Sequence, residues 1–147
     1  MIEVSDVSKS FVLHNQGGAV IPVMAGASLQ VELGECVALT GASGAGKSTL
    51  MRMIYGNYLT GGGQILVGGG DVAAAQPREI LGLRKHTLGY VSQFLRVVPR
   101  VPTVDVVAEP LLITGHSVED ARTRAETLLT RLNFPQTLWP LSPTTIS

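Results

Sequence analysis

The first third of the chain alternates between apolar and polar positions. Residues 29–33 show the alternation most clearly, with the two-residue period of a strand that buries one face. Residues 2–33 follow the same pattern in short runs, interrupted by the polar and glycine-containing stretch 14–18. The pattern predicts an antiparallel β layer over about residues 1–35.

A continuous apolar run follows this layer. Residues 36–40 have the composition of a strand buried on both faces of a mainly parallel sheet, which makes Cys36 a small buried apolar side chain. Apolar residues then recur at helical spacing over residues 48–55, and Gly56 is a typical helix stop. We therefore expect strand, loop and helix over residues 36–56.

The later patterns predict further strands and helices. Pro77 suits the first turn of a helix, and Ser117 followed by Asp120 suits a helix start. The predicted elements are strands at residues 64–67 and 87–92, and helices at residues 77–86, 103–112 and 117–132. Residues 134–147 contain three prolines, and no element is predicted there.

Composition narrows the class of protein. The 147 residues suit one domain, and a charged fraction of 15% with 45% hydrophobic residues is typical of a folded chain. Eleven basic and eleven acidic residues cancel, so nucleic acid is not an expected partner. The single cysteine excludes a disulfide framework and permits a reducing cytoplasm. No apolar run approaches the ~18 residues of a membrane span, so membrane insertion is not expected.

A phosphate-binding motif carries the chemistry. The residues Gly41, Ala42, Ser43, Gly44, Ala45, Gly46, Lys47 and Ser48 match G-x-x-x-x-G-K-[ST] between the predicted strand and helix. Glycines let backbone N–H groups converge on phosphate oxygens, and the helix start adds a partial positive charge. Lys47 can reach the β- and γ-phosphates, Ser48 supplies an oxygen ligand for Mg²⁺, and Thr49 adds a hydroxyl near the α-phosphate.

The surroundings of this motif resemble the ABC ATPase family. The resemblance rests on the antiparallel layer and on residues 34–41, 48–50 and 89–93, and it covers almost the whole chain. It implies an α/β fold of the P-loop NTPase, ABC ATPase type. Residues 1–147 would then be the N-terminal portion of one nucleotide-binding domain, with a Q-loop and part of the helical subdomain in residues 87–147.

The resemblance also implies site residues and ligands. Gln93 would contact Mg²⁺ or the attacking water, so that Ser48 and Gln93 are the expected metal residues. Phe11 matches the aromatic side chain that stacks on adenine, although its apolar neighbours are equally compatible with a core position. ATP and Mg²⁺ are the implied cofactors, and a second ABC ATPase subunit, homologous or identical, is an implied partner.

Three segments resemble one branch of the family. Residues 91–100, 128–133 and 138–145 are similar to PhnL-type ATP-binding proteins, which implies a cytoplasmic subunit that partners the phosphonate carbon–phosphorus lyase core complex. Two alternatives remain open. The first is the ATPase of a lipoprotein-release or macrolide-export transporter, and the second is a nucleotide-binding fragment without turnover.

Hydrolysis by this family requires residues that the sequence lacks. None of the eleven acidic residues follows four apolar ones, as the Walker B carboxylate does, and Glu109 comes nearest. No switch histidine is found, and Ile146 and Ser147 match the first two positions of the signature motif. We therefore expect a truncated form that lacks the C-terminal part of the core, with ATPase activity in the full-length form.

Overall fold

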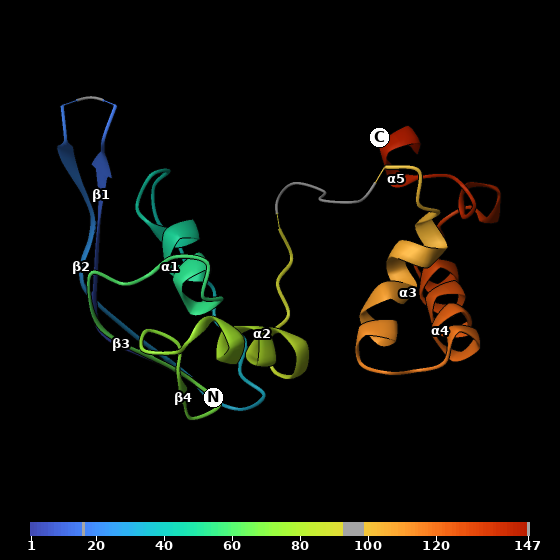
Figure 1. The fold of residues 1–147 in the computed structure, drawn as a ribbon, viewed down its shortest axis with the longest axis horizontal. Coiled ribbons are helices and arrows are strands. Elements are labelled where there is room, and N and C mark those ends of the chain that lie inside the picture. The colour runs from blue at the N-terminus through green and yellow to red at the C-terminus, as the bar shows by residue number, and fades with distance from the viewer. Residues whose placement is uncertain (16, 93–98, 147) are drawn as a thin grey trace. The chain divides into compact units, whose positions relative to one another are not determined.

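The computed structural model describes residues 1–15, 17–92 and 99–146. The chain forms two compact units, Met1–Gly89 and Tyr90–Ser147, and each is described by itself (Figure 1). Each unit contains its own cluster of buried apolar side chains. The boundary lies close to residue 87, where the sequence predicts the Q-loop and helical subdomain to begin.

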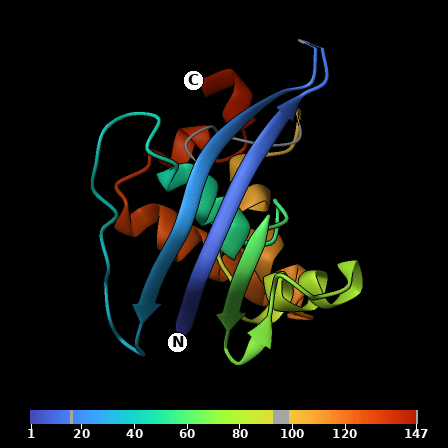
Figure 2. The same cartoon turned by 90° about the vertical axis from the view of Figure 1, so that its left-hand side faces the viewer.

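The first unit contains the predicted antiparallel layer, which is confirmed. Its strands are β1 (Ile2–Leu13), β2 (Ala19–Val31), β3 (Gly62–Val67) and β4 (Gly70–Asp71), in the order β2-β1-β3-β4. β1 is central because Ile2 pairs with Val31 on one side and with Val67 on the other. Figure 2 shows these long strands side by side, with helix α1 behind them.

Helices α1 (Lys47–Ile54) and α2 (Pro77–His86) lie on the same side of this sheet (Figure 1). Met53 of α1 and Ile65 of β3 are fully buried between helix and sheet. The rest of the core consists of Val4, Val7, Leu50, Ile54, Val67 and Val72. Burial of this apolar surface holds α1, and with it the loop that precedes α1, against the sheet.

Helix α2 has the predicted bounds. Pro77 occupies its first turn, and the Gln76 and Glu79 side chains cap each other's backbone N–H groups in a reciprocal capping box. Arg84 donates hydrogen bonds to the Tyr55 carbonyl (3.1 Å) and to Asn57 Oδ1 (2.7 Å), and its guanidinium lies 4.5 Å from the Tyr55 ring centroid. Arg84 therefore ties α2 to the end of α1.

Two predicted strands are wrong in the structure. Residues 36–40 and 87–92 have no ladder partner within the described part of the chain, and Cys36 is exposed rather than buried. An apolar run indicates side chains that are buried in the folded protein. A strand forms only where a second strand pairs with its backbone N–H and C=O groups. Leu39 and Leu88 still pack against the core from these segments.

The second unit is helical. Its elements are α3 (Thr103–Ile113), α4 (Val118–Arg131), the short 3₁₀ helix η1 (Gln136–Leu138) and α5 (Pro143–Ile146). The two longer helices match the prediction, and Ser117 caps α4 by accepting a hydrogen bond from the Asp120 N–H (3.1 Å). Small side chains at Ala108, Ala121 and Ala125 let α3 and α4 pack closely. Among the described residues, no helix is long and apolar enough to span a bilayer.

Candidate functional site

The predicted phosphate loop lies between residue 40 and the first turn of α1. Gly46 is the residue before the helix, in a left-handed conformation with φ 85°, and it has no side chain with which to cap the helix. The first N–H groups of α1 therefore point toward the loop with no capping side chain from Gly46. A helix start of this kind favours an anion, because its N–H groups carry the positive end of the helix dipole.

Strand β2 contacts the phosphate loop at Gly46. The pairs Lys9–Met24 and Ser10–Pro22 leave Val23 as an extra residue, which is a β-bulge. A Cβ atom at position 46 would lie 3.1 Å from the Val23 carbonyl oxygen and 3.4 Å from Met24 Cε. The bulge thus brings the strand into direct contact with the loop, close enough that only glycine fits without a shift.

Lys47 folds across the loop. Its Nζ donates hydrogen bonds to the carbonyls of Gly41 (2.8 Å) and Ala42 (2.7 Å), which hold the ammonium group at the other end of the motif. Ala45 N–H donates to the same Ala42 carbonyl at 3.3 Å. The ammonium is therefore already placed over the loop, where it can meet a phosphate.

A pocket of about 310 Å³ lies inside this loop. It is lined by Val23, Ser43, Gly44, Ala45, Gly46, Lys47, Ser48 and Thr49. Lys47 supplies the ionisable group of this lining, and no carboxylate is among these residues. The donors fit a phosphate group: backbone N–H groups, a helix start, one ammonium and the hydroxyls of Ser48 and Thr49.

The structure brings most of the predicted nucleotide residues together. Residues 43–49 line the pocket, and the carbonyls of Gly41 and Ala42 hold Lys47 beside it. Of the two predicted metal residues, Ser48 lines the pocket, and its hydroxyl is a suitable oxygen ligand for Mg²⁺. Gln93 lies outside the described residues, and in the described part of the chain no group of three or more His, Cys, Asp or Glu could hold a metal ion.

Phe11 lies on β1, partly buried, in contact with an aromatic side chain and a cation. Its ring centroid is 5.5 Å from that of Tyr58, with the planes at 79°, and 5.2 Å from Lys9 Nζ. The register pairs Phe11 with Ile21, two residues before Val23 of the pocket lining. Sequence reasoning missed Val23 and Tyr58: a bulge and a loop contact bring them to the site, and neither produces a periodic pattern.

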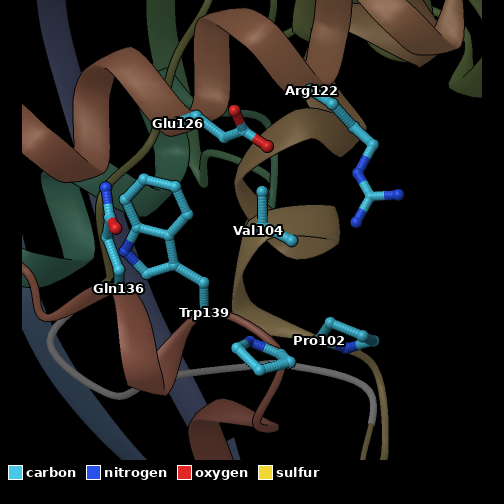
Figure 3. Close-up of a pocket in the computed structure, with 7 residues that line it drawn as sticks. Pro102, Val104, Arg122, Glu126, Gln136 and Trp139 are labelled. Atoms are coloured by element: carbon cyan, nitrogen blue, oxygen red, sulfur yellow. The ribbon is translucent and has the colours of Figure 1, made fainter.

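A second pocket lies within the helical unit (Figure 3). It has a volume of about 370 Å³, and its lining includes Val104 of α3, Arg122 and Glu126 of α4, and Trp139. The Trp139 indole N–H donates to the Phe134 carbonyl at 3.1 Å, which fixes the ring. Among the residues that the structure describes, none of the predicted nucleotide residues lines this pocket.

Comparison with known proteins identifies the family. The family model described as "ABC transporter" matches residues 24–147. The chain is 38% identical over 79% of its length to a lipoprotein-releasing system ATP-binding protein LolD of Xylella fastidiosa. It is 35% identical over 91% of its length to the macrolide export ATP-binding/permease protein MacB of Brucella abortus. Methionine import ATP-binding protein MetN of Caulobacter vibrioides is 38% identical over 91% of the chain.

The chain spans less than half of each of these relatives, namely 48% of the LolD protein, 20% of MacB and 39% of MetN. Among solved structures, it superposes on the ATP-binding cassette MJ0796, described as a dimeric post-hydrolysis state bound to ADP and Pi, with a TM-score of 0.90. The match has 23% sequence identity and covers 100% of this chain and 63% of that one. It supports the predicted P-loop NTPase fold of the ABC ATPase type.

Proposed function

The chain belongs to the ABC transporter family, and we propose that its loop 41–49 binds the phosphates of MgATP. The observation that carries this proposal is the pocket formed by glycines, the start of α1 and the Lys47 ammonium. Charge-assisted hydrogen bonds from an ammonium and from backbone N–H groups are the strong ones for phosphate. The pocket lining offers these donors without a competing carboxylate.

Each predicted residue has a role in this proposal. Lys47 contacts the β- and γ-phosphates, Thr49 lies near the α-phosphate, and Phe11 stacks on adenine. Ser48 supplies a hydroxyl oxygen to Mg²⁺, with Gln93 as the second metal residue. Bound Mg²⁺ neutralises the negative charge of the triphosphate.

We assign the two units to two parts of the family's nucleotide-binding domain. Met1–Gly89 contains the phosphate loop, and Tyr90–Ser147 contributes to the helical subdomain. The full protein is then an ATPase that works with a second ABC ATPase subunit, because hydrolysis needs a signature motif facing the γ-phosphate. The sequence 1–147 contains neither that complete motif nor a Walker B carboxylate.

For the biological system, we propose an ATP-binding subunit in the cytoplasm that serves the phosphonate carbon–phosphorus lyase core complex. The support is the resemblance of residues 91–100, 128–133 and 138–145 to PhnL-type proteins. The second candidate is the ATPase of a membrane transporter, which the names of the LolD, MacB and MetN relatives favour. Affinity purification of the full protein separates the two, since the first predicts a soluble lyase core and the second a membrane-embedded permease.

Nucleotide binding is tested by titration with a fluorescent ATP analogue in the presence of Mg²⁺. We expect Lys47→Ala to weaken binding at least about tenfold, because a charge-assisted contact is lost. Lys85→Ala is the matched control, since Lys85 is an exposed lysine in the last turn of α2. Equal affinity of the two variants would show that the phosphate loop does not bind the nucleotide through Lys47.

A further inference from the structure

Tyr58 contacts Phe11, the aromatic side chain that is proposed to stack on adenine. It belongs to the segment between α1 and β3, and its ring meets Phe11 edge to face, with 5.5 Å between centroids. Both rings are partly buried, and Tyr58 also packs against the core of the first unit. An edge-to-face contact restricts the tilt of the partner ring, because other orientations lose the favourable quadrupole interaction.

Arg52 holds Tyr58 to helix α1. Its Nη1 donates a hydrogen bond to the Tyr58 hydroxyl at 2.9 Å, and its guanidinium carbon lies 5.6 Å from the Tyr58 ring centroid. The Tyr58 N–H donates to the Arg52 carbonyl at 3.3 Å. Since α1 begins at Lys47, one rigid helix carries both the phosphate-binding lysine and the anchor of Tyr58.

Lys9 of β1 holds the residue that follows Tyr58. Its Nζ donates to the Leu59 carbonyl at 2.6 Å and lies 5.2 Å from the centroid of the Phe11 ring. The Gly61 N–H donates to the Ser8 carbonyl at 2.7 Å. The segment that carries Tyr58 is thus attached to α1 at its beginning and to β1 at its end.

Phe11 lies on the face of the sheet that the phosphate loop contacts. Lys9 and Phe11 share one face of β1 because side chains alternate along a strand, and Lys9 Nζ accordingly lies 5.2 Å from the centroid of the Phe11 ring. The register pairs Lys9 with Met24, next to the bulged residue Val23, and paired residues in an antiparallel ladder point to the same face. Met24 Cε lies 3.4 Å from the position that a Cβ atom of residue 46 would occupy, so the Phe11 ring is on the face of the sheet where the phosphate loop lies.

We propose that Tyr58, anchored by Arg52, is a positioning residue that orients the Phe11 ring for stacking on the adenine base. The inference rests on the proposed function, in which Phe11 contacts adenine and Lys47 contacts the phosphates. Tyr58 acts through Phe11 and does not touch the nucleotide. The contacts from Arg52 to Tyr58 and from Tyr58 to Phe11 connect the ring that stacks on adenine to helix α1. Helix α1 begins at the phosphate loop, so it fixes the distance between the adenine site and the phosphate site.

The test compares two ligands on the full protein. A non-hydrolysable ATP analogue reports on both base and phosphate contacts, and inorganic tripolyphosphate reports on phosphate contacts alone. Both are titrated calorimetrically, with Mg²⁺, against wild type, Tyr58→Leu, Phe11→Ala and the double variant. Tyr58→Phe separates the two contacts of Tyr58, because it keeps the ring that contacts Phe11 and removes the hydroxyl that accepts the Arg52 hydrogen bond.

We expect Tyr58→Leu to weaken the ATP analogue about two- to tenfold, the range of an aromatic pair contact, and to leave tripolyphosphate affinity unchanged. In the Phe11→Ala background, Tyr58→Leu should have no further effect, since the two residues act in series. Tyr58→Phe should weaken the analogue less than Tyr58→Leu does, because it keeps the ring contact with Phe11 and loses only the hydrogen bond from Arg52. If Tyr58→Leu is too unstable to titrate, Arg52→Met replaces it, with a selective loss of analogue affinity expected.

Three results would overturn the proposal. Equal losses of the analogue and of tripolyphosphate in Tyr58→Leu would show a merely structural role. If Tyr58→Leu weakens binding as much in the Phe11→Ala background as in wild type, Tyr58 does not act through Phe11. If Arg52→Met binds the ATP analogue as tightly as wild type, Arg52 does not anchor Tyr58. The proposed function fails separately, if Lys47→Ala leaves the affinity of both ligands unchanged.

Discussion

The Val23 carbonyl oxygen would lie 3.1 Å from a Cβ atom at position 46, so this strand residue excludes a side chain from the phosphate loop at Gly46. Val23 Cγ1 closes the same space at 3.3 Å. The contact exists because β2 has an extra residue at Val23, next to the pair Lys9–Met24. A bulge in the antiparallel layer therefore determines how closely α1 and its loop approach the sheet.

Gly46→Ala should lower the free energy of unfolding more than Gly44→Ala does. Both glycines have positive φ (85° and 83°), so both variants suffer the backbone strain of about 1–2 kcal/mol. Only position 46 adds a clash, because a Cβ at position 44 meets nothing within 4 Å. Urea unfolding of both variants measures the difference. Equal losses would mean that the loop moves away from Val23 at no cost.

The Asp71 carboxylate should make the first unit sensitive to acid. The pKa of Asp71 lies below its ordinary value of 3.8, mainly because the Gln64 side chain donates a hydrogen bond to Oδ2 at 2.9 Å. Partial burial acts in the opposite direction and raises the pKa. Backbone N–H groups, including those of Ala73 and Ala74, donate to the same carboxylate and lower the pKa further. A pKa lowered in the folded state means that the stabilisation is complete above the unfolded value and is lost as the pH falls through the folded value.

The corresponding experiment uses Asp71→Asn. This variant should be less stable than wild type at about pH 7, and the difference should shrink in acid, at a pH below the ordinary carboxylate value of 3.8. Gln64→Leu removes the main cause of the pKa shift and should show the same trend. Urea unfolding at the two pH values provides the measurement, and a difference that does not change with pH would contradict the prediction.

Residues 1–147 alone should bind nucleotide without hydrolysing it. They hold the triphosphate through Lys47 and Ser48 in the proposal, but no acidic residue follows an apolar run in the way that places a base for the attacking water. Phosphate release should therefore stay at background. A longer protein in which a complete signature motif and a Walker B strand follow residue 147 should release phosphate.

Turnover by residues 1–147 would contradict this expectation if Lys47→Ala abolished it. Glu109 would then be the first residue to replace, since it has the nearest approach to the required apolar run. Glu109→Gln should remove the activity in that case. The comparison also guards against a contaminating ATPase, whose activity would survive Lys47→Ala.

The helices of this protein were more predictable than its strands. Pro77 and Ser117 mark helix starts through local chemistry, and the structure has α2 and α4 where these residues predict them. The apolar residues 36–40 and 87–92 gave equally strong patterns, yet they form no strand in the described structure. The backbone hydrogen bonds of a helix join residues four positions apart in the same segment. A strand instead needs hydrogen bonds from a second strand that is distant in the sequence, and no local pattern specifies that partner.

The same distinction applies to the site. The phosphate loop was predictable because its glycines, Lys47 and Ser48 are consecutive in sequence and fold locally at a helix start. Val23 comes from β2 through a bulge, and Tyr58 reaches Phe11 across 47 residues of chain (58 minus 11). Such contacts depend on strand register and on loop closure, which a single sequence does not reveal.

The central position of β1 has a consequence for the order of folding. Its first residue, Ile2, pairs both with Val31 and with Val67. β1 is therefore the first strand to leave the ribosome, but its pairing is complete only after its second partner, β3, has been synthesised. Until then β1 and β2 form a two-stranded ribbon, which is marginally stable in water. The helical unit, by contrast, joins α3 and α4 through neighbouring sequence and closes a short loop. We expect α3 and α4 to assemble quickly, and formation of the sheet to limit the refolding rate.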